Sequence, residues 1–347
     1  MAVTLKDVAT LAGVSVKTVS NVVNGYAFVK PDNRRRVEAA LAATGYRPNV
    51  GARNLRRGRT GFLALMVPEL SIPYFGELAG LVITAAQRRG WSVLIEQTQG
   101  TRARERATLD SLGPHLVDGA LVHPEALEAA DFPDPADGIP MVLLGEHAVD
   151  LAIDRVAIDN VVAAHTAVSH LLSLGRRRIA AIGVNPERGT ASLRLEGYRA
   201  ALADAGLSVV DSLLAPAAKY HRAVGAAAMK DLLALDEPPD AVFCFNDLLA
   251  VGALRSAAER GLDVPGDIAI VGFDNTEESA FSLPPLTTIA PDKAAIAEAA
   301  IELINARLTT GADGAPREVQ PPFSLEIRES TAGVGAGETV RAGVQNR

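Results

Sequence analysis

Between residues 61 and 330, short apolar runs alternate with stretches of helical periodicity, and this alternation restricts the fold more than any other feature. Short apolar runs between turn signals are typical of strands buried on both faces of a parallel sheet. Intervening helices supply the crossovers that parallel strands need. The sequence therefore predicts doubly wound α/β sheets. The expected strands are 62–68, 91–98, 119–123, 141–145, 178–184, 241–245, 268–273 and 287–290, and the expected helices are 75–89, 161–174, 193–205, 224–235, 248–260 and 293–308.

The first sixty residues differ from the rest of the chain in charge. They hold eleven Lys and Arg against three Asp and Glu, a net charge of +8, whereas the remaining residues hold 23 against 38, a net charge of −15. A basic segment on an acidic body places a surface for a polyanion in that segment. The alternative is a solvated basic tail, which the helix signals of the same residues oppose.

The composition argues against several other classes of protein. The apolar runs are too short to cross a membrane, and the charged N-terminal residues do not fit a signal peptide. The single cysteine, Cys244, cannot form an internal disulfide. The six histidines show no metal-ligand spacing. We therefore expect a cytoplasmic protein with no membrane partner, no metal and no cofactor.

Residues 1–47 carry the signals of three short helices. Thr4 and Asp7 have the spacing of a capping box in front of an apolar helical face. A glycine-containing turn leads to a second helix, in which polar groups alternate with inward-facing valines, and a third helix begins near Pro31. This pattern predicts a helix-turn-helix, with an ordinary three-helix bundle as the alternative.

Four segments of this region, VTLKDVA, AGVS, TVSNVVNG and GYRPN, closely resemble the headpiece of the lactose/galactose repressor (LacI) family. The resemblance extends to about residue 330 and covers nearly the whole chain. It implies a sequence-specific DNA-binding transcription regulator, most simply a repressor of a carbohydrate-uptake or catabolism operon. Its expected partners are a pseudo-palindromic double-stranded DNA operator, a second copy of the chain and a small sugar-like effector that releases it from DNA.

The resemblance also implies a domain organisation. It gives a helix-turn-helix headpiece at 1–47, a hinge helix or linker at 48–60 and an effector-binding and dimerisation core at 61–330. The core would have the type I periplasmic-binding-protein fold, with two similar subdomains around a ligand cleft. Residues 331–347 form the expected flexible polar tail; they hold four glycines and no leucine heptad, so we expect a dimer and not a tetramer.

In that family the second helix lies in the major groove. Carried over by position, Val16, Lys17 and Asn21 face base edges. Lysine can donate to guanine O6 and N7, and asparagine can bind adenine through two hydrogen bonds. Many relatives carry Arg at the position of Asn21, so we expect different bases there. The residues implied to contact phosphates are Ser15, Thr18, Ser20 and Asn24.

The segment from residue 49 to residue 58 resembles the family's hinge helix. It is short and glycine-containing, so we expect a flexible linker in the absence of DNA. On DNA, Ala52 would allow two hinge helices to approach each other closely, and Leu55 would insert into the minor groove at a central base step. The implied phosphate contacts are Arg53, Arg56 and Arg57.

Polar side chains follow several strands of the expected core. Ligands of doubly wound sheets bind beyond the carboxyl ends of the strands. The resemblance implies effector contacts at these positions, and a guanidinium, a carboxylate, an amide and an aromatic face suit a polyhydroxylated ring. Tyr74 is expected on the opposite wall. The remaining effector positions are Thr190, Arg194, Tyr220, Asn246 and Asp274.

Each of these residues also has a structural interpretation. Arg194 can pair with Glu196 or Glu187 at the surface, Asn246 can cap the following helix, and Asp274 can cap a turn. Their joint placement at the ends of strands favours the effector site.

Three departures from the family pattern leave the ligand open. Gly145 stands where sugar-responsive members often have Asp, and Pro291 and Lys293 stand where some relatives have an amide and an aromatic residue. The ligand is then a different sugar, a sugar acid or phosphate bound by Lys293, or a non-sugar such as a purine. Co-repression, in which the ligand strengthens DNA binding, is the alternative to induction.

An enzyme on the same α/β core is the other class of function. The sequence has neither a phosphate-binding G-x-x-x-x-G-K-[ST] loop nor a G-x-G-x-x-G between a strand and a helix. Asp159, Asp247 and Asp274 can imitate a carboxylate site, but no nucleophile–base set accompanies them. We therefore expect no catalytic residues.

Overall fold

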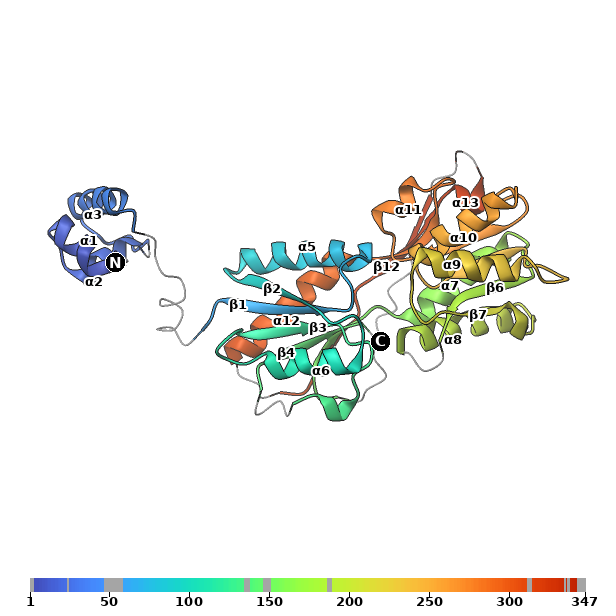
Figure 1. Cartoon of the computed structure of the whole chain (residues 1–347), viewed down its shortest axis with the longest axis horizontal. Helices are drawn as coiled ribbons and strands as arrows, with labels where there is room; N and C mark the ends of the chain where they lie inside the picture. Colours follow the sequence, from blue (N-terminus) through green and yellow to red (C-terminus); the bar gives the residue numbers. More distant parts are fainter. Residues whose placement is uncertain are drawn as a thin grey trace. The chain divides into compact units, whose positions relative to one another are not determined.

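The computed structural model describes residues 3–23, 25–46, 59–133, 138–145, 151–185, 189–310, 314–333, 335 and 338–341. The chain divides into two compact units, Met1–Thr60 and Gly61–Arg347 (Figure 1). Within the described ranges, no helix combines the length and apolar character that crossing a bilayer requires.

The first unit consists of α1 (Leu5–Ala12), α2 (Val16–Val23) and α3 (Pro31–Thr44). The capping box at the start of α1 is confirmed, because the Asp7 carboxylate accepts a hydrogen bond from the Thr4 backbone N–H at 2.8 Å and the Thr4 side chain accepts one from the Asp7 backbone N–H. The hydrogen bonds from Thr4 lower the pKa of the Asp7 carboxyl. Local sequence signals therefore account for where this unit begins its first helix.

Small apolar side chains hold the three helices together. Val8, Val19 and Val37, one from each helix, are fully buried. Arg36 on α3 donates a hydrogen bond to the Ala12 carbonyl at 2.6 Å, at the end of α1. This packing orients α2 so that its opposite face remains exposed.

The second unit contains two sheets. Their strands are β1 (Phe62–Val67), β2 (Ser92–Gln97), β3 (Gly119–Val122), β4 (Met141–Leu144), β5 (Asp154–Val156), β6 (Ile179–Val184), β7 (Leu214–Pro216), β8 (Ala241–Cys244), β9 (Ala269–Phe273), β10 (Thr287–Pro291), β11 (Glu318–Val319), β12 (Phe323–Ile327) and β13 (Glu338–Arg341). The strand orders are β11-β5-β4-β3-β1-β2 and β13-β12-β10-β9-β8-β6-β7. Pairing is parallel, except that β12 is antiparallel to both β10 and β13.

Helices cover both faces of these sheets (Figure 1). On β1, Leu63 and Leu65 pack in one apolar cluster with α5 and α12, whereas Ala64 and Met66 pack in another cluster with α6. Successive strand residues point to opposite faces, so both faces are buried as a continuous apolar run predicts. The helices are α5 (Pro73–Arg88), α6 (Arg102–Ser111), α7 (Asn160–Ser173), α8 (Gly189–Asp204), α9 (Arg222–Leu232), α10 (Asp247–Glu259), α11 (Glu277–Phe281), α12 (Lys293–Thr310) and α13 (Glu329–Ala332).

The unit has two subdomains. The first subdomain comprises β1–β5 and β11 with α5, α6 and α12, and the second comprises β6–β10, β12 and β13 with α7–α11 and α13. The chain passes between them after β5, between β10 and α12, and between β11 and β12. The doubly wound two-subdomain core expected from the sequence is therefore confirmed.

Several details differ from the expectation. β2 lies at a sheet edge and is largely exposed, so a strand buried on both faces was the wrong interpretation for residues 91–98. α8 begins at Gly189 and not at residue 193, because a glycine start gives little helix signal. The short strands β5, β7 and β11 are too brief to show periodicity.

The expected flexible tail at 331–347 is also incorrect in part. Thr331 and Ala332 belong to α13, and β13 adds an antiparallel strand to β12. This pairing supplies hydrogen-bond partners for backbone groups of β12. The sequence of the tail does not predict the strand, because β13 forms only where the edge strand β12 is available to pair with it.

Helices α9 and α10 touch along their backbones. A Cβ on Gly252 would lie 2.0 Å from the Arg222 carbonyl oxygen, and one on Gly225 would lie 2.1 Å from the Leu249 carbonyl oxygen. We predict that Gly252→Ala lowers the free energy of unfolding by about 1–3 kcal/mol, because overpacking outweighs the better helix propensity of alanine. Urea unfolding followed by circular dichroism measures this.

The matched control is Gly80→Ala on α5, where a Cβ would meet nothing within 4 Å. This variant should keep its stability or gain up to about 1 kcal/mol. Equal stability of Gly252→Ala and the unaltered chain would contradict the close helix contact.

Candidate functional site

The exposed face of α2 carries the residues expected to contact DNA. Ser15, Val16 and Lys17 are exposed, and Thr18, Ser20 and Asn21 are half-buried. The Thr18 backbone N–H donates to Ser15 Oγ at 3.1 Å, so Ser15 caps the helix. The structure thus brings six of the expected residues together around the start and outer face of α2. The remaining ones, Asn24, Ala52, Arg53, Leu55, Arg56 and Arg57, lie outside the described residues.

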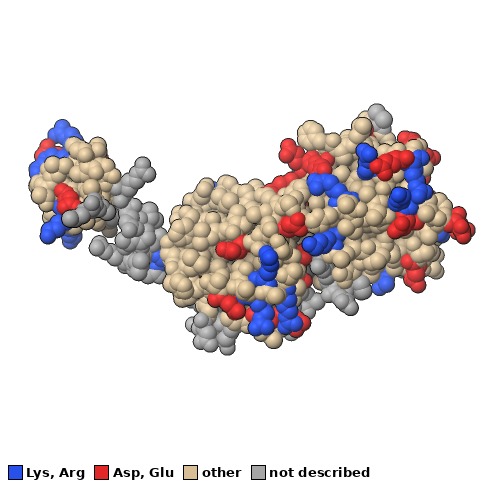
Figure 2. All heavy atoms as spheres, in the orientation of Figure 1, with Lys and Arg blue, Asp and Glu red and all other residues tan. Residues whose placement is uncertain are grey.

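The surroundings of α2 suit a polyanion. The first N–H groups of a helix and its dipole favour a phosphate at the N-terminus, where Lys17 also stands exposed. Figure 2 shows further Lys and Arg side chains on the visible face of this unit. The same helix therefore offers phosphate-binding groups at its start and side chains for base edges along its outer face.

A cavity of about 160 Å³ lies between the two subdomains of the second unit. It is bordered by residues that follow the carboxyl ends of β1, β3, β8 and β9, where doubly wound sheets place their ligands. All six residues expected at the effector site line it, namely Tyr74, Thr190, Arg194, Tyr220, Asn246 and Asp274.

Arg194, in the first half of α8, is buried within the second subdomain. Its Nε donates to Asn160 Oδ1 at 2.8 Å, Nη1 donates to the Phe245 carbonyl oxygen, and the guanidinium stacks 3.5 Å from the centre of the Phe273 ring. Arg194 is therefore held by these groups and not by a surface pairing with Glu196, while Glu187, the other expected partner, lies outside the described residues. No other described residue accepts a hydrogen bond from Nη2, so its hydrogens can serve a ligand beside the cavity.

Asp274 follows β9 and is 7% exposed. Among the described residues, no hydrogen bond reaches its carboxylate oxygens, although Lys293 bonds to its backbone carbonyl. Burial raises the pKa of Asp274 to about 8, against the opposing effect of the nearby Arg194 charge. The carboxyl group thus lies on the cavity wall in an environment that favours its protonated form. Hydrogen-bond donors of a ligand would favour the ionised form instead.

Two other cavity residues have structural bonds as well. Asn246 Oδ1 accepts from the Leu249 backbone N–H at 2.9 Å, so Asn246 does cap α10. The Tyr220 hydroxyl donates to the Gly183 carbonyl at 2.8 Å. Tyr220 consequently presents its ring, and Asn246 its amide group, from fixed positions.

An aromatic group forms the wall contributed by the first subdomain. Phe75 stands edge-on to Tyr74, with ring centres 5.3 Å apart, and edge-on to His123, at 4.9 Å. Burial raises the pKa of the Tyr74 hydroxyl, and the Asp274 charge across the cavity adds to the effect. The two subdomains therefore bring Tyr74 and Asp274 to the same space.

His123 also explains one departure from the family pattern. A Cβ on Gly145 would lie 2.9 Å from His123 Nε2, and Gly145 has φ of 78°, which disfavours any side chain. A side chain at this position would require the His123 imidazole, which occupies the adjoining space, to move.

Several cavity residues were not foreseen from the sequence. Asn160 orients Arg194 and follows β5, a strand too short to detect, so no expected strand end pointed to it. His221 Nε2 lies 3.1 Å from Glu69 Oε2, which joins the second subdomain to the first. A hydrogen bond from Ser71 lowers the pKa of Glu69, and His221 contributes. The other unforeseen lining residues include Gln99, Glu125 and Lys219.

Lys293 does not serve the ligand role considered for it. Its Nζ donates to Glu77 Oε2 at 2.6 Å and to the backbone carbonyls of Asp274 and Asn275 at 2.9 and 2.8 Å. These three bonds use all three hydrogens of the ammonium group. A sugar acid or phosphate would therefore have to compete with an existing network for this charge.

Comparison with known proteins agrees with both units. Residues 4–49 match the family described as "Bacterial regulatory proteins, lacI family", and residues 168–331 match "Periplasmic binding protein-like domain". The chain is 37% identical over 305 residues to the HTH-type transcriptional repressor CytR of Escherichia coli K12, covering 87% of this chain and 89% of that protein. It is 34% identical over 312 residues to the ribose operon repressor of the same organism, covering 88% and 93%.

Among solved structures, the chain resembles the lac repressor dimer bound to operator and the anti-inducer ONPF. The TM-score is 0.83 at 27% identity, and the match covers 96% of this chain and 100% of that one. The curated relatives are transcriptional repressors and not enzymes, in agreement with the expectation from the sequence. The chain therefore belongs to the lacI family of bacterial regulatory proteins, in which a helix-turn-helix unit is joined to a periplasmic-binding-protein-like core.

Proposed function

We propose that this regulator is a dimeric repressor that leaves a pseudo-palindromic operator when a small polyhydroxylated ligand fills the cleft. The observation that carries the proposal is that Arg194 and Asp274 line one cavity, and that within the described part of the chain no hydrogen bond uses the Nη2 hydrogens of Arg194 or the carboxyl oxygens of Asp274. Adjacent sugar hydroxyls both donate and accept, so such a pair can satisfy them together.

The charges of the cleft favour a neutral sugar over an anion. The Lys293 ammonium is fully engaged, so it offers no free hydrogen to an anion. Ionisation of Asp274, which hydroxyl donors of a neutral sugar would favour, would add a negative charge beside a phosphate or a carboxylate. A cavity of about 150 Å³ accepts a benzene-sized ring, so this one, at about 160 Å³, has room for at least one small ring. Because one relative is named the ribose operon repressor, D-ribose is the first compound to test.

The aromatic wall supports a second candidate, a nucleoside. Phe75 and His123 offer ring surfaces opposite the Arg194 and Asp274 pair. A planar base could lie against these rings while its sugar occupies the polar end. Such a ligand can act either as an inducer or as a co-repressor, and the operator response to it distinguishes the two.

DNA recognition rests on α2. In the proposed arrangement Ser15 and Thr18 contact phosphates, while Val16, Lys17 and Asn21 read base edges. Two copies related by a dyad would meet inverted half-sites, as the lac repressor dimer on its operator suggests. Such a regulator acts where the chromosome lies, so we place it in the cytoplasm. For residues 49–58 the hinge role remains part of this proposal.

Selection of binding sites from random DNA tests the operator proposal. We predict an inverted repeat, with Lys17→Ala losing about 1–3 kcal/mol of preference at one base pair of each half-site. The matched control is Lys6→Ala, which removes the same charge from the exposed side of α1 and should weaken all sequences about equally. An asymmetric consensus would refute the dyad.

Operator titration with a compound panel tests the effector proposal. The panel contains D-ribose, D-galactose, D-ribose 5-phosphate, adenosine, cytidine and adenine. For the compound that acts, we predict that Arg194→Ala loses one to two decades of affinity, about 1.5–3 kcal/mol, because a charged donor is removed. Asp274→Asn should lose a similar amount, and calorimetry measures both.

Operator affinity without ligand should stay unchanged in these variants, since the first unit is untouched. Arg199→Ala is the matched control, because this arginine is exposed on the same helix α8. Normal ligand binding by a folded Arg194→Ala variant would show that the arginine has only a structural role.

A further inference from the structure

The segment that carries Asp274 has an unusual backbone. Asp274 has φ of 109° and the next residue, Asn275, has φ of 46°, so two successive non-glycine residues adopt positive φ. Such conformations are costly and persist only where the surrounding structure enforces them. The position of the Asp274 carboxyl in the cleft therefore depends on whatever holds this turn.

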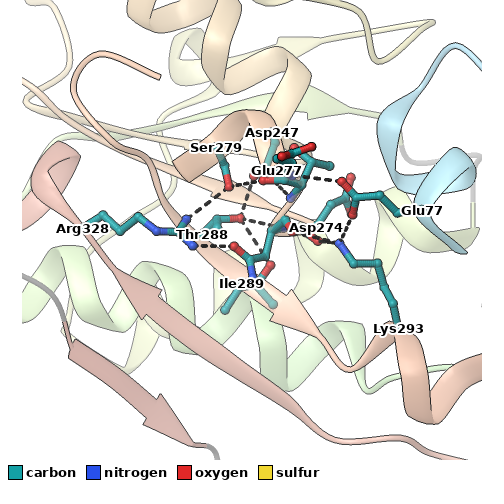
Figure 3. A network of polar contacts seen from close by, with 11 residues as sticks. Glu77, Asp247, Asp274, Glu277, Ser279, Thr288, Ile289, Lys293 and Arg328 are labelled. Atoms are coloured by element: carbon teal, nitrogen blue, oxygen red, sulfur yellow. Dashed lines mark hydrogen bonds and ion pairs between the residues drawn. The ribbon is translucent and has the colours of Figure 1, made fainter. Parts of the chain in front are cut away.

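Three side chains from separate parts of the chain, Lys293, Arg328 and Asp247, hold the turn (Figure 3). Lys293, at the start of α12, donates to the carbonyls of both Asp274 and Asn275. Arg328 donates to Asn275 Oδ1 at 2.6 Å, and Asp247 accepts from the Thr276 backbone N–H at 2.8 Å. Arg328 and Asp247 lie in the second subdomain, so they stabilise the turn by contacts within the subdomain to which it belongs.

Glu77 contributes from the first subdomain. Figure 3 shows this side chain reaching from α5 toward Lys293. One carboxylate oxygen accepts from Lys293 Nζ at 2.6 Å, and the other accepts from the Glu277 backbone N–H at 2.9 Å. The side chain of Lys293 is 13% exposed and that of Glu77 is 31% exposed, so the ammonium group is the more shielded partner. A single carboxylate thus connects helix α5 to both ends of the segment 274–277.

We propose that Lys293 and Glu77 are positioning residues that hold the Asp274–Asn275 turn and couple occupation of the cleft to the first subdomain. The inference rests on the proposed function for its ligand. When a bound ligand shifts the Asp274 carboxyl, the backbone carbonyls of Asp274 and Asn275 shift with it, and so does Lys293, which donates to both. Glu77, which accepts from Lys293, then transmits this displacement to α5. The first subdomain begins with β1, which directly follows the DNA-binding unit in the chain.

Stabilising the contact between α5 and α12 is a poor explanation of the Lys293–Glu77 ion pair. Ion pairs add little net stability, whether they are exposed and screened by solvent or buried at the cost of their hydration, and this half-buried pair lies between the two cases. Helices α5 and α12 are already joined at the surface by the ion pair of Arg88 with Glu298. That second pair touches neither Asp274 nor its neighbours, so Arg88→Ala is a matched control that removes one α5–α12 ion pair, while Arg89 keeps its contact with Glu298.

Hydrogen–deuterium exchange on the full chain tests the positioning role without any ligand. In Lys293→Met and in the milder Glu77→Gln, we expect amides 274–277 to exchange about tenfold faster than in the unaltered chain. Arg88→Ala should leave these amides unchanged. Unaltered exchange in both Lys293→Met and Glu77→Gln would overturn the proposal.

Operator titration tests the coupling, with D-ribose and adenosine as the probes. The two variants should bind operator normally without probe, while the probe-induced change in operator affinity falls about tenfold. Faster exchange with an undiminished probe effect would overturn the coupling, since the residues would then only brace the turn. If neither probe affects the unaltered protein, the proposed ligand class fails, whereas the exchange result still decides the positioning role.

Discussion

Buried carboxylates at the carboxyl end of the second sheet constrain the core more than any other interaction. Burial raises the pKa of Asp274 to about 8 and that of Asp247 to about 6. Asp247 is compensated internally, because Thr288 Oγ1 donates to it at 2.6 Å and Thr276 donates from its backbone. Asp274 has the Arg194 charge nearby but no donor of its own among the described residues, and a ligand with hydroxyl groups would supply one.

Much of the fold followed from local patterns in the sequence. Continuous apolar runs such as Phe62–Val67 predicted buried parallel strands, and the capping-box spacing of Thr4 and Asp7 predicted the start of the first helix. The missed elements depend on distant partners. β13 exists by pairing with β12, and β2 is exposed because it lies at an edge, which no periodicity reveals.

The site was foreseen through the family resemblance and only in part through physical pattern. Six residues from separate segments line one cavity, yet the bonds that set their roles join remote positions. Lys293 lies 216 residues from Glu77 in the chain, and His123 fills the space beside Gly145. Sequence alone indicated that Lys293 and Gly145 differ from relatives. Tertiary packing was needed to show that the Lys293 charge is engaged by Glu77 and that His123 lies where a side chain at position 145 would go.

The central claim is that a ligand completes the coordination of the Asp274 carboxyl, and proton release on binding tests it most directly. Without ligand, the raised pKa keeps Asp274 protonated at neutral pH. Hydroxyl donors favour the ionised form and lower that pKa, so calorimetry in buffers of different ionisation enthalpy should show about one proton released per ligand at pH 7 and almost none at pH 9. Asp274→Asn should abolish the release. Binding at pH 7 with no proton released, or with proton uptake, would contradict the account.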